Sequence, residues 1–145
     1  MVASCDLATA SESAKFATPG VNIGLFCSTP MVALSRNVHK KSAMEMLLTG
    51  DMITAEKAKE IGLINDYFKL ENLTSETMIL ANKIASKSSM TVAIGKAAFY
   101  TQSELDLSAA YEYTSKVMLN NIQKEDAKEG IDAFIEKRTP EWSDR

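Results

Sequence analysis

The sequence is poor in the residues that build disulfide frameworks, metal centres and membrane spans. It has two cysteines in 145 residues, Cys5 and Cys27, and we expect both to be free thiols in a reducing compartment. It has one histidine, His39, which lies beside two lysines and is typical of a surface position. No cluster of metal-ligand type is present, and no apolar run nears the roughly 20 residues that a bilayer span needs. We predict neither a metal site nor a membrane segment.

An excess of charge of one sign is also missing. The 19 acidic and 16 basic residues are spread along the chain and give a net charge of -3. No block of Lys or Arg is interleaved with aromatics, so nucleic acid is not an expected partner. The six glycines form neither a phosphate-binding loop nor a nucleotide fingerprint. With 46% hydrophobic and 24% charged residues, the composition is that of one globular domain.

The first 28 residues predict short strands rather than helices. The start MVASCDLATA has neither the basic flank nor the long apolar core of a signal peptide. The run Val2–Thr9 resembles a buried strand without a preceding turn, so we expect the chain to begin within a domain. A second strand-like run covers Lys15–Ala17, and Gly20 and Gly24 then mark a loop.

From Thr29-Pro30 onward the pattern predicts five or six helices, with Thr29 as the first N-cap and Pro30 at the first helical position. A short strand is predicted over Ile64–Phe68. The other helix boundaries are predicted from Thr54 and Asp106 as N-caps, Ser89 as a helix start, Asp126 with Glu129 at capping-box spacing, Gly50 and Gly62 as helix ends, and Thr139-Pro140 as the last stop.

One stretch carries a family resemblance. Residues 43–64, AMEMLLTGDMITAEKAKEIGLI, closely resemble the crotonase (enoyl-CoA hydratase/isomerase) superfamily, with a helix ending in Leu-Thr-Gly, a capped Ala-rich helix and a Gly-Leu turn into a strand. The start, with Cys5-Asp6 and then Pro19, and the end, AFIEKR over residues 133–138, agree with the same family. The resemblance covers essentially the whole chain and rests on several motifs together.

The resemblance implies an α/β fold of the crotonase spiral type, truncated to a short β-rich start and a mostly helical C-terminal region. Residues 1–145 would be the C-terminal half of such a domain, with 1–68 at the edge of the core and 69–145 as a helical oligomerisation region. The sequence of Thr18–Pro30 resembles that of a mitochondrial subgroup of this family with bacterial relatives. We therefore expect a mitochondrial matrix location if the source is eukaryotic and a cytoplasmic one if it is bacterial.

The resemblance also implies that this chain lacks catalytic residues. Crotonase chemistry needs two backbone N–H groups for the thioester oxyanion and carboxylates for proton transfer. In the family, the oxyanion donors and the first catalytic glutamate precede the position of Met1, and the second glutamate falls at Gly20, where glycine cannot carry a proton. Asp6, Glu12 and Glu45 are possible substitutes, although Asp6 fits better as an anchor of a backbone turn and Glu45 as part of a solvated helix face.

Coenzyme A is expected to meet the terminal helix. In the resembling family this helix reaches the CoA nucleotide of a neighbouring subunit, which implies Lys137 as a phosphate contact and Phe134 as an adenine contact. The two are three residues apart, so we expect them to share one helix face. Lys96 is a weaker candidate of the same kind. A core phenylalanine with a solvated lysine explains the pattern equally well.

Phe26, Cys27 and Met31 are candidates for lining the acyl region. Ordinary core packing is the alternative for all three. Cys27 is not expected to be a nucleophile, because no neighbouring histidine in the sequence would activate its thiol.

We therefore expect an enoyl-CoA hydratase/isomerase family protein, a lyase by family, that handles acyl-CoA thioesters in fatty-acid metabolism, with this chain inactive by itself. The partners would be acyl-CoA or enoyl-CoA, with no separate cofactor because CoA belongs to the substrate, and further copies of the chain in a homotrimer or dimer of trimers. The alternatives are a non-catalytic acyl-CoA-binding or assembly module, and a helical oligomer unrelated to CoA.

Overall fold

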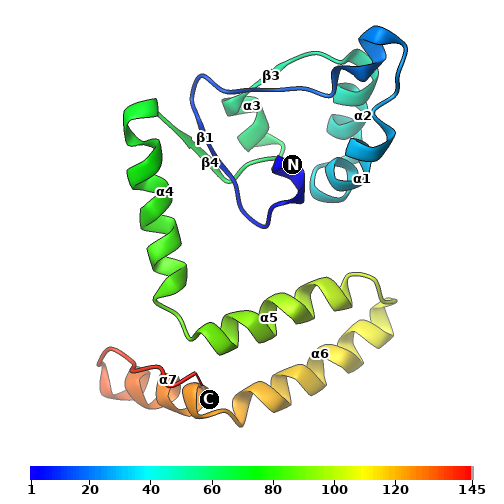
Figure 1. Cartoon of the computed structure of the whole chain (residues 1–145). Coiled ribbons are helices and arrows are strands. Elements are labelled where there is room, and N and C mark those ends of the chain that lie inside the picture. Colours follow the sequence, from blue (N-terminus) through cyan, green and yellow to red (C-terminus); the bar gives the residue numbers. More distant parts are fainter. Residues whose placement is uncertain (145) are drawn as a thin grey trace. The chain divides into compact units, whose positions relative to one another are not determined.

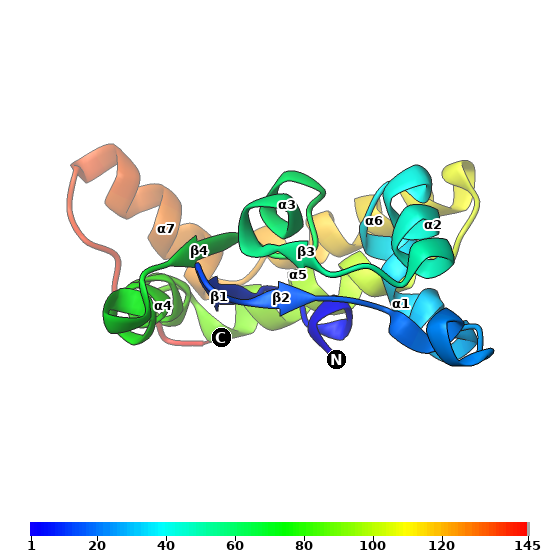
Figure 2. The same cartoon turned by 90° about the horizontal axis from the view of Figure 1, so that it is seen from above.

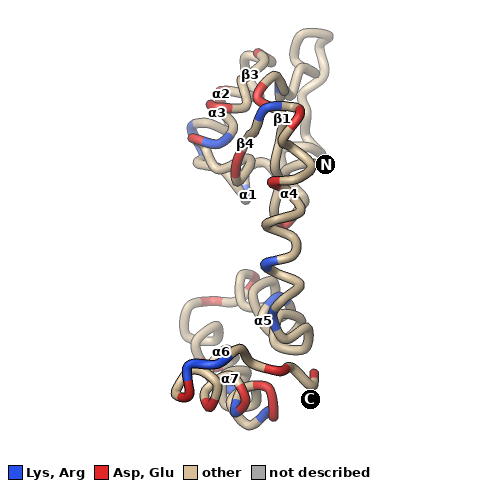
Figure 3. Tube along the Cα trace, turned by 90° about the vertical axis from the view of Figure 1, so that its left-hand side faces the viewer, with Lys and Arg blue, Asp and Glu red and all other residues tan. Residues whose placement is uncertain are grey.

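The computed structural model describes residues 1–144 as two compact units (Figure 1). Unit 1 is Met1–Leu80, unit 2 is Ala81–Arg145, and the division falls inside helix α4, Leu70–Ala85. Acidic and basic residues occur in both units (Figure 3). None of the helices over residues 1–144 is both long and apolar enough to cross a bilayer.

The strands of unit 1 form two small ladders. Strand β1 (Thr9–Ser11) pairs in parallel with β4 (Asp66–Phe68), with Ala10 opposite Tyr67. Strand β2 (Lys15–Phe16) pairs antiparallel with β3 (Ile53–Thr54). The parallel pair needs a long crossover, which the intervening helices supply.

Three helices contribute to the core of unit 1, namely α1 (Ser28–Asn37), α2 (Lys40–Thr49) and α3 (Ala55–Glu60). Helix α3 packs against β2, β3 and β4, seen from above in Figure 2, and α1 packs against α2. Two 3-10 helices, η1 (Val2–Ser4) and η2 (Pro19–Ile23), pack against α1 and α2 respectively. The buried apolar cluster consists of Ala10, Leu34, Val38, Ala43, Met46, Leu47, Ala55, Ala58, Ile61, Leu63 and Ile64.

Unit 2 is helical throughout its regular structure. Helix α5 (Ser89–Gln102) packs against α6 (Leu107–Ile122), and α6 packs against α7 (Glu125–Glu136). Its buried residues are few and small, with Ala98, Ala110 and Ala133 as the apolar ones. Most of the apolar surface of these helices is therefore exposed in the single chain.

Several boundaries predicted from the sequence are confirmed. Gly50 (φ 67°) and Gly62 (φ 78°) adopt the left-handed conformation just after α2 and α3. The Thr54 hydroxyl accepts from the Lys57 N–H at 3.1 Å, and the Asp106 carboxylate accepts from the Ala109 N–H at 2.9 Å. Each cap satisfies a helical N–H that has no partner within its helix.

Two predictions of local structure in unit 1 are wrong in their boundaries. The first strand is confined to Thr9–Ser11, because Met1–Cys5 closes a 3-10 turn instead. Helix α1 begins at Ser28, so Thr29 lies inside it and Cys27 is the N-cap.

In unit 2, Ser89 begins α5 as predicted, and Ser88 caps this helix by accepting from the Thr91 N–H. Helix α7 begins at Glu125, one residue before Asp126, so Asp126 is not its cap. The described residues hold seven α-helices rather than the predicted five or six.

Candidate functional site

The loop after β2 carries the position at which the family resemblance implies a lost glutamate. Pro19 starts η2, and Gly24 ends it with φ 78°, which lets the Leu25 N–H return to the Gly20 carbonyl at 2.9 Å. The buried Thr18 hydroxyl donates to the Met46 carbonyl at 2.8 Å and fixes the loop to α2. The loop is thus held at its start and closed on itself.

Gly20 sits in a space too small for a side chain. A Cβ built there would lie 2.6 Å from the Leu25 carbonyl oxygen and 2.8 Å from the Sγ of Cys27, both closer than real Cβ atoms come. The Gly20 N–H donates to the same sulfur at 3.3 Å. Position 20 therefore lacks a carboxylate and, with this loop conformation, has no room for one. The sequence did not reveal this contact, because the two partners are seven residues apart in an irregular segment.

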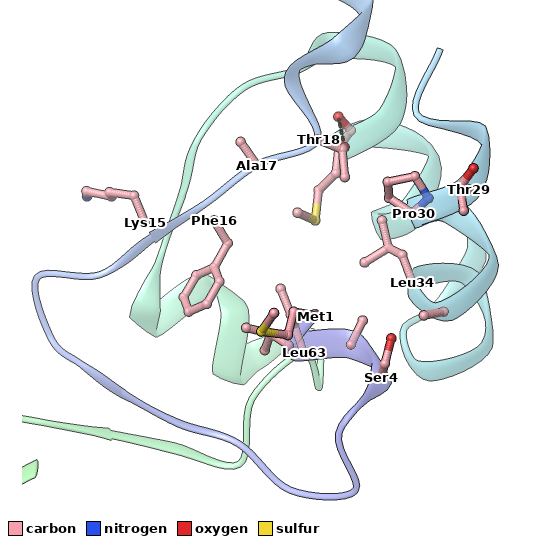
Figure 4. Close-up of a pocket in the computed structure, with 14 residues that line it drawn as sticks. Met1, Ser4, Lys15, Phe16, Ala17, Thr18, Thr29, Pro30, Leu34 and Leu63 are labelled. Carbon is pink, nitrogen blue, oxygen red and sulfur yellow. Dashed lines mark hydrogen bonds between the residues drawn. The ribbon is translucent and has the colours of Figure 1, made fainter. Parts of the chain in front are cut away.

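An apolar groove of about 610 Å³ lies beside this loop in unit 1 (Figure 4). Phe16 borders it from β2, and Pro30 and Leu34 from α1, with Met1 and Leu63 between them. The complete lining is Met1, Val2, Ala3, Ser4, Lys15, Phe16, Ala17, Thr18, Thr29, Pro30, Ala33, Leu34, Met46 and Leu63. No carboxylate or imidazole is among these described residues, and Lys15 is the one charged side chain that lines the groove.

The candidate acyl-region residues are not among those that line the groove. Phe26 and Met31 are exposed, and Cys27 is half-buried against the core of unit 1. None of the three is among the groove's lining residues. The structure brings Cys27 to Gly20, and it places Phe26 and Met31 at the surface of the same segment.

The possible substitutes for the missing glutamates do not meet in one place. Glu12 is exposed after β1, and Asp6 lies in the irregular segment before it. Glu45 is exposed on α2, and His39 is the exposed residue that precedes this helix. Within residues 1–144 no group of three or more His, Cys, Asp or Glu side chains could hold a metal ion.

The candidate CoA contacts lie in unit 2. Phe134 is 85% exposed near the end of α7. Lys137 is the residue after this helix and adopts a left-handed conformation, with φ 56° and ψ 38°. The expectation that the two share one helical face is therefore wrong, because the helix ends between them. Lys96 is exposed on α5.

The carboxylates of Asp126 and Asp144 hold the C-terminal segment to the rest of unit 2, and we call this set of hydrogen bonds the clasp. No motif in the sequence predicted it. Asp126 is 1% exposed and accepts from the Ser143 N–H at 2.8 Å and from the Asp144 N–H at 3.1 Å. Hydrogen bonds from Ser88, Ser143 and Asp144, with Ser88 the largest contribution, lower the pKa of Asp126. The Asp144 carboxylate in turn accepts from the Ser89 N–H at 2.8 Å, at the start of α5.

A second pair strengthens the same clasp. Arg138 donates to both carboxylate oxygens of Glu129, at 2.6 and 2.8 Å, and its Nε donates to Glu136 at 2.6 Å. The Arg138 hydrogen bonds, followed by the Glu141 N–H, lower the pKa of Glu129 to about 2. Glu136 is thus paired away from Lys137. A bidentate guanidinium–carboxylate pair also fixes the orientation of both side chains.

Comparison with known proteins identifies the class. The whole chain, residues 1–145, matches the family described as Enoyl-CoA hydratase/isomerase. The chain therefore belongs to this family and has the crotonase-type fold expected from its motifs.

Within the family it is similar to mitochondrial enoyl-CoA hydratase domain-containing protein 3. The mouse protein is 54% identical over 143 residues, which are 99% of this chain and 48% of that protein, and the human protein is 52% identical. The human crystal structure has a TM-score of 0.92 over 97% of this chain and 56% of that one. A crystal structure of an enoyl-CoA hydratase from Mycobacterium smegmatis, 49% identical, has a TM-score of 0.94 over 97% of this chain and 55% of its own. The chain thus spans about half the length of these relatives.

Proposed function

We propose that this chain serves acyl-CoA thioester metabolism as half of a crotonase-type domain and does not itself hydrate enoyl-CoA. Its observational support is the closed loop at Gly20, where the Leu25 carbonyl and the Cys27 sulfur occupy the side-chain space. The resemblance also puts both oxyanion donors outside these residues. Losing one such donor costs about 10²–10³ in rate, and losing the acid or base costs about 10²–10⁴.

Hydration of crotonyl-CoA by the purified chain tests this proposal. We expect no turnover above the uncatalysed rate, while a relative named enoyl-CoA hydratase, assayed in parallel, consumes the substrate. Turnover by this chain that a substitution such as Cys27→Ala or Lys15→Ala abolishes would overturn the proposal. Loss on substitution is required because it distinguishes activity of this chain from a contaminating hydratase.

Binding without turnover is the second candidate function, and the exposed terminal helix favours it. Phe134 presents an aromatic ring to solvent and Lys137 a nearby cation, a combination suited to a nucleotide. Calorimetric titration of the protein with CoA and with acyl-CoA, under conditions in which neither reacts, distinguishes this role from that of a helical oligomer unrelated to CoA. Saturable binding would support the acyl-CoA role. A lack of binding by the oligomeric protein would contradict it.

Association of several copies belongs to the same proposal. Phe134 (85%), Leu107 (75%) and Ile135 (70%) are exposed on the helices of unit 2. Apolar surface of this kind is typical of an oligomer interface, and closed symmetric assemblies are the common result. We propose a homotrimer or a dimer of trimers, which sedimentation at several concentrations tests. For a eukaryotic source we propose a mitochondrial location, as in the names of the similar proteins.

A further inference from the structure

Helix α7 ends on a lysine in a backbone conformation that favours glycine. Lys137 is one of two non-glycine residues with a positive φ in the described part of the chain. Its N–H donates to the Phe134 carbonyl at 3.3 Å, and the Arg138 N–H donates to the Ala133 carbonyl at 3.0 Å. This pair of hydrogen bonds is the Schellman ending of a helix, where glycine is usual because a side chain at positive φ is strained. A residue held in such a conformation is a candidate for a functional role.

The side chain of Arg138 supplies the contacts that hold this turn. Its guanidinium binds both carboxylate oxygens of Glu129, at 2.6 and 2.8 Å, and its Nε binds Glu136 at 2.6 Å. Arg138 directly follows Lys137 and both carboxylates belong to α7, so these bonds fix the direction in which the chain leaves the helix. Glu129 also accepts from the Glu141 N–H at 2.7 Å, which fixes the backbone beyond the turn.

The same contacts decide the charge around Lys137. Glu136 directly precedes Lys137 in the sequence, yet its carboxylate is bound by Arg138. Glu129 stays ionised at neutral pH, because the Arg138 hydrogen bonds, followed by the Glu141 N–H, lower its pKa to about 2. The guanidinium thus occupies the carboxylates that would otherwise compete with a phosphate for the exposed Lys137.

We propose that Arg138, together with Glu129, is a positioning residue for nucleotide binding: the pair holds Lys137 in the left-handed turn from which its ammonium binds a phosphate of CoA. The inference rests on the binding role proposed above. It adds that the lysine contributes only in this backbone conformation, and that Arg138 acts through the turn without touching the nucleotide. A lysine that acted as a freely moving charge would need neither partner.

Substitution of Glu129 separates positioning from simple charge. Glu129→Gln removes a negative charge from the neighbourhood of Lys137, so electrostatics alone predicts tighter binding of CoA. Loss of the bidentate pair predicts weaker binding, because Arg138 then no longer holds the turn. We expect CoA affinity to fall by about twofold to fivefold, the range in which an exposed charge acts, and its dependence on salt to decrease.

Two further variants identify the route by which Arg138 acts. Arg138→Lys keeps the charge and loses the planar fork, so it should weaken CoA binding as much as Arg138→Gln does. In a Lys137→Gly background the turn forms without strain and the ammonium is absent, so neither Arg138→Gln nor Glu129→Gln should lower the affinity further. Without CoA, amide exchange of residues 137 and 138 should become about threefold or more faster in Arg138→Gln.

The ion pair on α6 offers a matched control. Glu112 accepts from Lys116 at 2.7 Å on exposed surface, and Glu112→Gln should leave CoA affinity within about twofold. Calorimetry is carried out on the 145-residue chain and on this chain joined to the half of the mouse relative that the match does not cover. Circular dichroism shows that each variant is folded, and the conservative Glu129→Gln and Arg138→Lys provide the test if Arg138→Gln unfolds.

Four results would overturn the positioning role. They are tighter CoA binding by Glu129→Gln, full affinity in Arg138→Lys, a further loss on Arg138→Gln in the Lys137→Gly background, and unchanged amide exchange at the turn. The third would show that Arg138 contacts the nucleotide itself. If the unsubstituted protein binds no CoA in either form, the proposed binding role fails together with this inference. Binding that tolerates Arg138→Gln overturns the inference alone.

Discussion

The N–H of Gly20 donates to the Sγ of Cys27 at 3.3 Å, and this sulfur lies 2.8 Å from the position that a Cβ at residue 20 would take. The Leu25 carbonyl oxygen closes the same space from another direction, 2.6 Å from the ideal Cβ position. The glycine at position 20 and the closed loop are therefore one structural feature. Gly20→Glu alone would not recreate a catalytic carboxylate unless the segment from Gly20 to Cys27 moved.

Gly20→Ala should destabilise unit 1 by about 1–3 kcal/mol, the usual cost of overpacking a filled site. Cys27→Ala removes one of the two obstructing atoms, so the double variant should lose less than the sum of the single changes. Urea unfolding of the four proteins of this cycle measures the coupling between the two positions.

Gly95→Ala is the control for the glycine substitution. A Cβ there meets nothing within 4 Å, and Gly95 lies inside α5. It should stabilise by about 0.5–1 kcal/mol, because alanine favours the helix. If Gly20→Ala is equally harmless, the loop does not require glycine and the crowding at position 20 is relieved without cost.

Asp126→Asn should loosen the C-terminal segment. The carboxylate accepts from the backbone of Ser143 and Asp144 while nearly inaccessible to water, and hydrogen bonds to a charged acceptor are stronger than neutral ones. Amide exchange of Ser143 and Asp144 should become at least about tenfold faster. Glu125→Gln, one residue earlier and exposed, should leave these amides unchanged. Equal effects of both substitutions would contradict the clasp.

Acid should weaken unit 2 through Glu129. Its pKa is lowered from 4.5 to about 2 in the folded chain, so its contribution to stability is complete above the unfolded value and is lost as the pH falls from about 4.5 towards 2. The lowered pKa of Asp126 acts in the same direction. Thermal unfolding measured between roughly pH 6 and pH 2, a range that spans the unfolded and the folded pKa of Glu129, should show this loss. Glu129→Gln should make the dependence of stability on pH shallower. A pH dependence unaltered by Glu129→Gln would contradict the assignment.

Lys137→Asn should lower CoA affinity modestly and reduce its dependence on salt. Asparagine removes the charge and tolerates the left-handed conformation that Lys137 adopts, so the helix end is preserved. An exposed charge pair is worth about 0–1 kcal/mol, which corresponds to at most about fivefold in affinity. The measurement uses a chimera of this chain with the unmatched half of the mouse relative, at two salt concentrations, with Lys128→Gln on α7 as control. Unchanged affinity and salt dependence would leave Lys137 a solvated surface residue.

Motifs in the sequence were sufficient for the family and for much of the helical structure. Gly50, Thr54 and Asp106 were predicted as helix boundaries, and each performs that role. These predictions succeed because a cap depends on backbone groups within three or four residues of it. The prediction that Gly20 takes the place of a catalytic glutamate also rests on a motif rather than on any contact.

Contacts between distant residues were decided only by the tertiary structure. Asp126 had the spacing of a cap, yet its carboxylate binds residues 17 and 18 positions later, because burial beside the returning C-terminal segment offers it stronger partners. Likewise, Ala10 lies opposite Tyr67 in the parallel ladder of β1 and β4, and no sequence motif links these two residues. The sequence by itself determined the family and the helix boundaries at Gly50, Thr54 and Asp106, and it places a glycine at position 20. The packed chain decided that position 20 is closed to a side chain, since only folding brings the Leu25 carbonyl and the Cys27 sulfur to it.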